Sequence, residues 1–129
     1  MGEKGKPTKQ DKIEADNLME EVSEILEPCI KCGRCKSICP VFRVLREEHV
    51  SPRGKTIILS ENILDNVIFE CCLCKGCEKE CPLGVKVCDA ILKARNVMVL
   101  MGKGLKSNEE MIKNIWKYGT PFGKGEIKT

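Results

Sequence analysis

Aromatic side chains are scarce in this sequence: they make up 4% of its 129 residues, and there is a single histidine. The apolar core is therefore thin for a chain whose length fits one domain. No segment approaches the roughly 20 consecutive apolar residues of a membrane-spanning helix. The polar N-terminus lacks the apolar stretch of a secretory signal peptide. We therefore expect a cytoplasmic protein with no transmembrane segment.

Charge of one sign is not concentrated anywhere in the chain either. The net charge is only +3, and lysine and glutamate alternate along the sequence instead of forming blocks. A nucleic-acid interface would need clustered basic residues together with aromatic side chains that stack on bases. We therefore expect no nucleic-acid partner.

Cysteine, in contrast, is abundant, with ten residues. In a reducing compartment such a set indicates metal binding or catalysis more often than disulfides. Eight of the cysteines form two copies of the pattern C-x2-C-x2-C-x3-C-P, and the residues between them differ from copy to copy. The first copy comprises Cys29, Cys32, Cys35 and Cys39, and the second comprises Cys71, Cys74, Cys77 and Cys81.

This spacing is typical of proteins that hold two [4Fe–4S] clusters. Three cysteines separated by two residues can surround three irons of one cluster, and the cysteine before proline ligates the other cluster. We therefore predict that Cys29, Cys32, Cys35 and Cys81 bind cluster 1. Cluster 2 is predicted to be bound by Cys71, Cys74, Cys77 and Cys39.

Other interpretations of the cysteines fit less well. Structural zinc usually takes paired C-x2-C motifs without a third cysteine at this spacing, and haem attachment would need a histidine after a C-x2-C pair. Disulfides would need an oxidising compartment. Cys72 and Cys88 lie outside the repeat and are predicted to be small apolar filling residues.

The apolar pattern around the cysteines indicates helices and gives only weak strand signals. We predict helices over residues 11–27, 41–45, 87–101 and 107–118, and a further helix opened by Ser51 as N-cap. The apolar positions of these helices are Ile13, Leu18, Val22, Ile25 and Leu26; Ile57, Ile58, Leu59, Ile63 and Leu64, which suit a buried face; Val87, Ile91, Ala94, Met98 and Met101; and Met111, Ile112, Ile115 and Trp116. Met98, Met101 and Met111 are predicted to be core, and Trp116 and Tyr118 to pack or to contact a partner. The helices at 11–27 and 107–118 are predicted to be docking surfaces. Ser107 and Glu110 are predicted to form a capping box. The fold class is therefore mainly α, with a domain at residues 13–119 between a flexible tail at 1–12 and a C-terminal tail at 120–129.

Beyond the cysteines, the sequence has Ser51-Pro52-Arg53-Gly54-Lys55, Cys81-Pro82-x-Gly84-Val85 and Ala94-Arg95. Together with the repeat, these segments resemble the α-helical ferredoxin domain. That domain occurs in the glycolate oxidase iron–sulfur subunit and in the C and D subunits of heterodisulfide reductase. The resemblance implies two [4Fe–4S] clusters held between short helices.

The resemblance also implies that the chain transfers electrons and that catalysis lies elsewhere. Relatives often carry cysteine-rich CCG domains, but here Cys71-Cys72 is followed by Leu73 and not by glycine. We therefore assign no catalytic residue, and we expect a hetero-oligomer. Its catalytic partner would carry a flavin such as FAD or a CCG domain and would act on a heterodisulfide or on a 2-hydroxy acid such as glycolate or lactate. A free-standing soluble dicluster ferredoxin and a structural or sensing role for the clusters are the alternatives.

Overall fold

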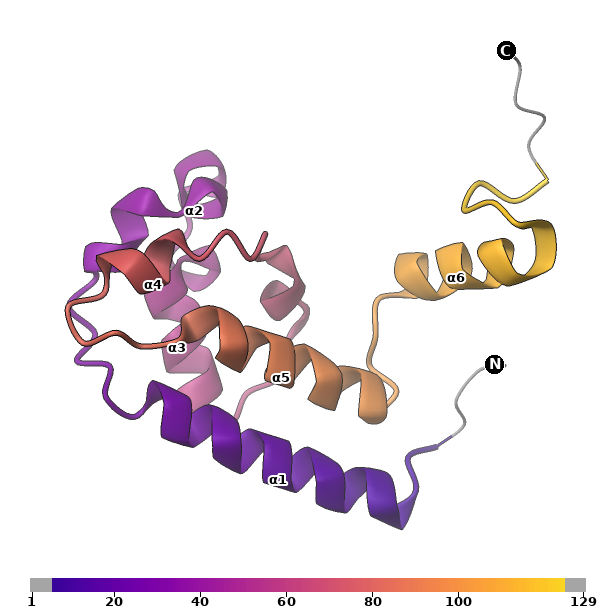
Figure 1. The fold of residues 1–129 in the computed structure, drawn as a ribbon, viewed down its shortest axis with the longest axis horizontal. Helices are drawn as coiled ribbons and strands as arrows, with labels where there is room; N and C mark the ends of the chain where they lie inside the picture. Colours follow the sequence, from indigo (N-terminus) through magenta and orange to yellow (C-terminus); the bar gives the residue numbers. More distant parts are fainter. Residues whose placement is uncertain (1–5, 125–129) are drawn as a thin grey trace.

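The computed structural model describes residues 6–124, and within this range the regular structure is entirely helical (Figure 1). The α-helices are α1 (Lys9–Leu26), α2 (Pro40–Leu45), α3 (Pro52–Ser60), α4 (Gly76–Glu80), α5 (Val87–Leu100) and α6 (Lys106–Tyr118). Three short 3-10 helices lie between them: η1 (Arg34–Ile38), η2 (Glu48–Val50) and η3 (Asn66–Glu70). The predicted mainly-α fold class is confirmed. None of these described helices combines the length and the apolarity that crossing a bilayer requires.

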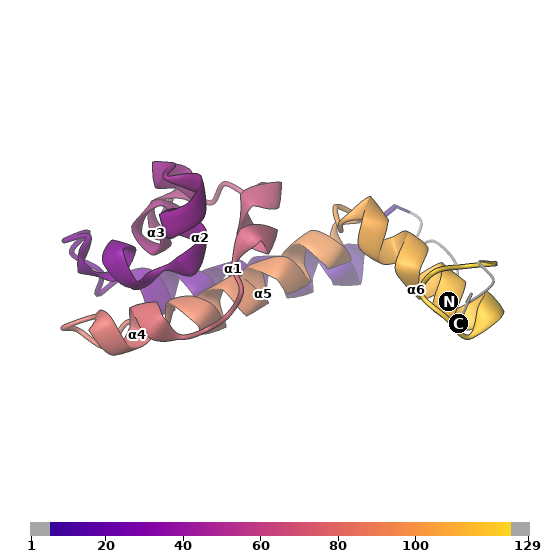
Figure 2. The same cartoon turned by 90° about the horizontal axis from the view of Figure 1, so that it is seen from above.

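Two long helices, α1 and α5, pack along each other and form the frame of the molecule (Figures 1 and 2). Val22 and Leu26 of α1 are buried in one core with Ile91 and Met98 of α5. An ion pair of 2.5 Å between Lys93 Nζ and a Glu21 carboxylate oxygen joins the same two helices at the surface. Burial of these aliphatic side chains supplies the main stabilisation that a core with few aromatics can offer.

Helix α3 begins as its local sequence predicts. The Ser51 hydroxyl accepts a hydrogen bond of 2.9 Å from the Gly54 amide, and Pro52 occupies the first helical turn. A Cβ on Gly54 would collide with the carbonyl oxygen of Glu48, so glycine allows η2 to pack directly against α3. Ser51, Lys55 and Thr56 are all buried, which places a row of polar side chains in the interior.

The cysteine segments and α6 lie at opposite ends of this frame. The chain around η1, α2 and α4 gathers at one end of the α1–α5 pair (Figures 1 and 2). Helix α6 projects beyond the other end and ends at Gly119, which has a φ of 74°. The described part of the chain therefore consists of a cysteine-bearing body and one protruding helix.

The structure corrects several predicted core positions. Ile13 is 63% exposed and Ile63 is 52% exposed, and Ile57 also lies at the surface. The apolar stripe of α1 that packs inward consists of Ala15, Val22 and Leu26. Periodicity alone misplaced these residues because it does not say which side of a helix a neighbouring element covers.

Helix α6 departs most from the predicted pattern. Its N-cap is Leu105, which makes no side-chain cap hydrogen bond, so the predicted capping box at Ser107 and Glu110 is wrong. The apolar residues Met111, Ile112, Ile115 and Trp116 are all exposed, so the core position predicted for Met111 is wrong. At the other end of the chain, α1 begins at Lys9, inside the predicted tail, with Thr8 and Asp11 forming a capping box. The division into a domain at 13–119 and two tails stays a prediction, and its residues 1–5 and 125–129 lie outside the described residues.

Replacing Leu26 by alanine tests the packing of α1 on α5. Leu26 is 2% exposed, so its truncation should cost about 2–5 kcal/mol of stability and lower the apparent midpoint of thermal unfolding. Ile13→Ala on the same helix is the matched control, and it should change stability by no more than about 0.5 kcal/mol. Equal shifts in circular-dichroism melts at one scan rate would contradict this assignment of the buried face.

Candidate metal centre

The two cysteine loops adopt the same backbone conformation although their sequences differ. The second residue after the first cysteine of each loop has a positive φ, 59° at Lys31 and 57° at Leu73. The residue two positions further along each loop also has a positive φ, 79° at Gly33 and 62° at Lys75. This region costs a residue with a side chain roughly 1–2 kcal/mol. Its recurrence at matched positions indicates a conformation required by function.

These turns direct amide groups at cysteine sulfurs. The N–H of Lys31 donates to Cys29 Sγ, and the N–H of Leu73 donates to Cys71 Sγ, each at 3.4 Å. A third amide, that of Val85, lies 3.4 Å from Cys81 Sγ. Hydrogen bonds of this kind stabilise a thiolate and tune the potential of a cluster bound to it.

The eight repeat cysteines surround two cavities. The first cavity has about 430 Å³ of space free of protein atoms, part of it open to solvent, and the second has about 340 Å³. The repeat cysteines lining the first cavity include Cys29, Cys32, Cys35 and Cys81, and those lining the second are Cys39, Cys71, Cys74 and Cys77. Cysteines of both loops therefore line each cavity, with Cys81 of the second loop at the first cavity and Cys39 of the first loop at the second. Cys77 lies between the cavities and contributes to both linings.

The donor set fits iron–sulfur clusters. All ten cysteines are free thiols, so none is taken up by a disulfide. Within residues 6–124, no three cysteine, histidine or carboxylate side chains converge tightly enough to hold a single metal ion. A zinc ion would need its sulfurs about 2.3 Å away from one centre. The repeat cysteines instead line two separate cavities, as two clusters containing several irons require.

Comparison with known proteins agrees with this geometry. Residues 25–85 match the family model described as a 4Fe-4S dicluster domain. This segment is a 4Fe-4S dicluster domain. It binds two [4Fe–4S] clusters.

The similar proteins include subunits of oxidoreductases, two of which are named as iron–sulfur subunits. Over 117 residues, the chain is 28% identical to an iron-sulfur subunit of the CoB--CoM heterodisulfide reductase of Methanopyrus kandleri, covering 80% of this chain and 61% of the relative. It is 30% identical over 88 residues to a subunit of the H(2):CoB-CoM heterodisulfide,ferredoxin reductase of Methanothermobacter thermautotrophicus, covering 67% of this chain and 48% of the relative. The glycolate oxidase iron-sulfur subunit of Escherichia coli is 31% identical over 74 residues, which are 51% of this chain and 18% of that protein. The chain therefore spans less than two thirds of the length of these relatives.

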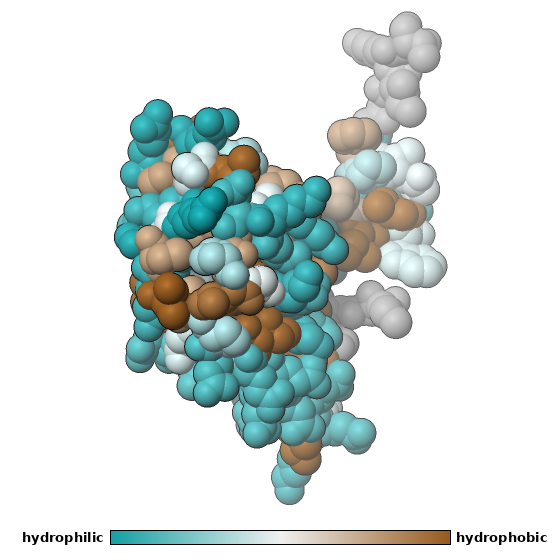
Figure 3. Space-filling view, turned by 60° about the vertical axis from the view of Figure 1, so that its left-hand side comes forward, coloured by the Kyte–Doolittle hydropathy of each residue, from teal (hydrophilic) through white to brown (hydrophobic). Residues whose placement is uncertain are grey.

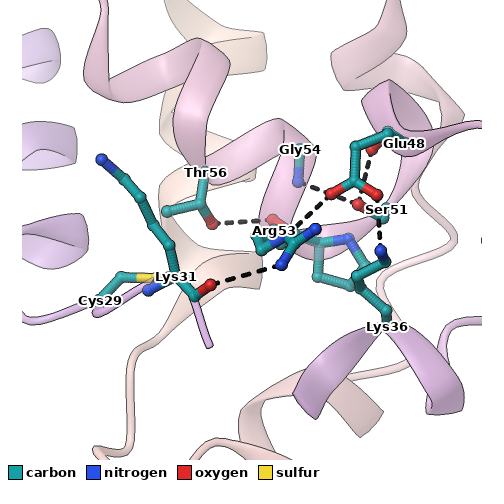
Figure 4. A network of polar contacts seen from close by, with 9 residues as sticks. Cys29, Lys31, Lys36, Glu48, Ser51, Arg53, Gly54 and Thr56 are labelled. Carbon is teal, nitrogen blue, oxygen red and sulfur yellow. Dashed lines mark hydrogen bonds and ion pairs between the residues drawn. The ribbon is translucent and has the colours of Figure 1, made fainter. Parts of the chain in front are cut away.

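A polar network holds the first loop of the dicluster domain against α3 (Figure 4). The Glu48 carboxylate accepts from Arg53 Nε at 2.8 Å and pairs with Lys36 Nζ at 2.6 Å. The other end of the Arg53 guanidinium approaches the Lys31 carbonyl at 3.5 Å. Hydrogen bonds from Lys36 and Arg53 hold the pKa of Glu48 below its usual value. The sequence alone marks Arg53 only as part of a motif, and the structure shows how it positions the loop.

Arg95 has the corresponding role for the second loop. Its Nη2 donates to the Cys71 carbonyl at 2.6 Å, and its Nε donates to the Ile68 carbonyl at 3.2 Å. The guanidinium also lies over the ring of Phe69, 5.7 Å from its centroid. Helix α5 therefore fixes the start of the second loop, although nothing in the sequence marks Arg95 beyond its place in the resemblance.

The two cysteines outside the repeat both reach the second cavity. Cys88 is 1% exposed and lies beside the thiol of Cys77, whereas Cys72 is exposed. The Cys88 amide donates to a Glu78 carboxylate oxygen at 3.1 Å. The interpretation of both as fillers stays a prediction, as does the assignment of the eight ligands, but the second cavity offers six cysteines in all.

Replacing the proline-adjacent cysteines tests the crossed arrangement. Cys39→Ser should remove or alter the cluster of the second cavity and leave the other intact, and Cys81→Ser should do the reverse, because each sulfur lines the cavity of the opposite loop. Iron analysis and electron paramagnetic resonance of the reduced protein would separate the two signals. Cys88→Ala is the control and should keep both clusters. If Cys39→Ser spared the second cluster and damaged the first, the crossed arrangement would be wrong.

Cluster incorporation should depend on pH. Burial raises the pKa of the Cys35 thiol and of the Cys77 thiol, so both are protonated in the cluster-free protein near neutrality. Binding needs thiolates and therefore releases protons, so incorporation should become more favourable as pH rises from about 6 to about 9. Anaerobic reconstitution of cluster-free protein, followed by iron analysis, measures this. A yield that fell or stayed constant with rising pH would contradict the expectation.

Proposed function

We propose that this chain is the electron-transfer subunit of an oxidoreductase complex. The observation that carries the proposal is the pair of cysteine-lined cavities held in one helical body, each with one exposed cysteine of the repeat. The exposed residues are Cys32 and Cys74, the second cysteines of the two motifs. When bound, [4Fe–4S] clusters supply reversible one-electron carriers. Cys32 and Cys74 would hold their clusters close to the surface, where an electron can enter or leave.

The residues of the chain prepare these sites for electron transfer. The Lys31, Leu73 and Val85 amides donate to sulfur and favour its charged form. Apolar side chains including Val87 line the cavities and keep water from part of each site. Because the relatives are named as subunits of larger oxidoreductases, we infer that catalysis lies on a partner protein.

Exposed apolar residues lie at the first cavity among basic ones and suit docking of a partner. Ile30 and Leu83 both line this cavity and are 68% and 49% exposed. Figure 3 looks onto the end of the molecule that carries the cysteine loops and shows apolar side chains gathered on it. An apolar patch with a polar rim is a common form of protein interface.

The exposed apolar face of helix α6 favours a permanent complex with a partner protein over a freely diffusing electron carrier. It stands away from the body (Figure 2), and Trp116 is 74% exposed beside the exposed Ile112 and Ile115. Aromatic anchors of this kind are typical of stable interfaces. A free-standing ferredoxin would expose this face to water permanently.

The relatives indicate the class of partner. Their names describe them as subunits of heterodisulfide reductases and of glycolate oxidase. We infer a hetero-oligomer in a reducing compartment such as the cytoplasm. Its catalytic member carries FAD or a CCG cysteine-rich domain and acts on a heterodisulfide or a 2-hydroxy acid.

Anaerobic purification of a tagged copy from its own cells tests the proposal. We expect a flavoprotein or CCG protein in a fixed ratio, and we expect the partner's substrate to exchange electrons with the clusters. Isolation as a monomer that accepts electrons from many unrelated enzymes would favour the free ferredoxin instead.

A surface variant then locates the docking site. Ile30→Lys should leave iron content unchanged and slow electron exchange with the partner at least tenfold, because it places a charge on the apolar surface around the first cavity. Leu92→Lys is the control, since Leu92 is also 48% exposed but lines neither cavity. Equal behaviour of the two variants in stopped-flow kinetics would exclude this docking surface.

A further inference from the structure

Helix α3 lies between the two cavities and provides a cation to each. Arg53 lines the first cavity, and Lys55, two residues further on, lines the second. Both belong to the Ser51-Pro52-Arg53-Gly54-Lys55 segment. The close approach of η2 at Gly54 fixes the position of this helix, so the two cations are held in place by the backbone.

The two cations have different surroundings. Arg53 is partly exposed and forms an ion pair with Glu48, so most of its charge is compensated within the protein. Lys55 is 2% exposed, and its Nζ donates to the Val50 carbonyl at 2.8 Å. Among residues 6–124, no carboxylate forms an ion pair with Lys55.

A buried ammonium group in this position is costly unless it meets negative charge. It has three donors, and a single carbonyl does not compensate a buried charge. Of the residues that line the second cavity, Lys55 is the only one with a side chain that carries positive charge, and six of the others are cysteines. The only negative charge that this lining offers is therefore that of cysteine thiolates and of a group bound to them.

We propose that Lys55 is the internal countercharge of the second cluster and raises its reduction potential. The inference rests on the proposed function only in that the cluster is reduced and reoxidised. Reduction adds one electron and no atoms, and the electron comes from a partner's reduced flavin or iron–sulfur group. A fixed positive charge in a low-dielectric site stabilises the more negative, reduced form.

Lys55 could instead serve only to tie α3 to Val50, and the choice of variants separates the two roles. Lys55→Met removes the charge and keeps a side chain of similar length. Lys55→Gln keeps a hydrogen-bond donor without the charge, and it carries the test should the methionine variant fail to fold. Lys55→Arg keeps the charge.

A second lysine near the same cluster provides a matched control. Lys75 lies between Cys74 and Cys77 but is exposed and does not line the cavity. Lys75→Met removes the same charge near the same cluster, where water and salt already screen it. Its effect on the potential should be clearly smaller than that of Lys55→Met.

Redox titration of the purified dicluster protein, with dithionite as reductant and electron paramagnetic resonance as readout, measures both clusters without any partner. Lys55→Met and Lys55→Gln should each lower the reduced-to-oxidised ratio of the second cluster at least tenfold at a fixed potential. A tenfold change corresponds to about 59 mV for one electron. Lys55→Arg should stay close to the wild type, and the first cluster should move less in every variant.

Three results would overturn the inference. They are an unchanged second cluster in both charge-removing variants, an equal shift of both clusters, and a Lys75→Met effect as large as that of Lys55→Met. The proposed function fails separately, because in that case the clusters of the wild-type protein would show no reversible reduction or no partner would exchange electrons with them.

Discussion

Neither cysteine loop can surround its cavity alone, and the rest of the structure follows from this constraint. Both loops contribute cysteines to each cavity: Cys39 of the first loop lines the second cavity, and Cys81 of the second loop lines the first. The short helices η1 and α4 that precede these two cysteines therefore have to pack against each other. In a chain with few aromatics, the two clusters link segments that are distant in the sequence. Their binding therefore contributes to the free energy of folding.

Bringing thiolates together in a partly buried place requires positive charge and hydrogen-bond donors. The structure provides donors through strained backbone at Lys31 and Leu73, whose amides meet the first sulfur of each loop. It provides cations through Arg53 and Lys55 of α3, which line the two cavities, while Arg53 and Arg95 hold the loops in place. The local strain is tolerated because the surrounding helices determine the position of these residues.

Sequence reasoning predicted the features that depend on local or covalent rules. The presence of two [4Fe–4S] clusters follows from the cysteine spacing, and the start of α3 follows from Ser51 and Pro52. It could not predict the left-handed conformation of Lys31 and Leu73, because these residue types do not mark it. It also could not show that Lys55 is buried, since a lysine in a helix is normally solvated.

Helix α6 shows a different limit of sequence reasoning. An amphipathic pattern indicates that one face of a helix will be covered, but not whether the chain itself or another protein covers it. Ile112 and Trp116 have the spacing of core residues, yet both are exposed in the described structure. The same ambiguity placed Ile13 and Ile63 in the core. For Ile13 and Ile63, exposure of a single apolar side chain is ordinary, whereas on α6 the whole apolar face is uncovered.

The two cysteine motifs are nearly equivalent, so any functional difference between the clusters must come from their surroundings. The loops share their backbone conformation, their amide–sulfur bonds and one exposed repeat cysteine each. Helix α3 makes the two sites different. Arg53 lines the first cavity and is paired with Glu48, whereas Lys55 lines the second and forms no ion pair with a carboxylate of the described residues. Two clusters with the same ligands therefore experience different electrostatic fields. An electron occupies one of two clusters preferentially only if their reduction potentials differ. Here the Ser51–Lys55 segment at the start of α3 provides the difference in charge that would separate the two potentials.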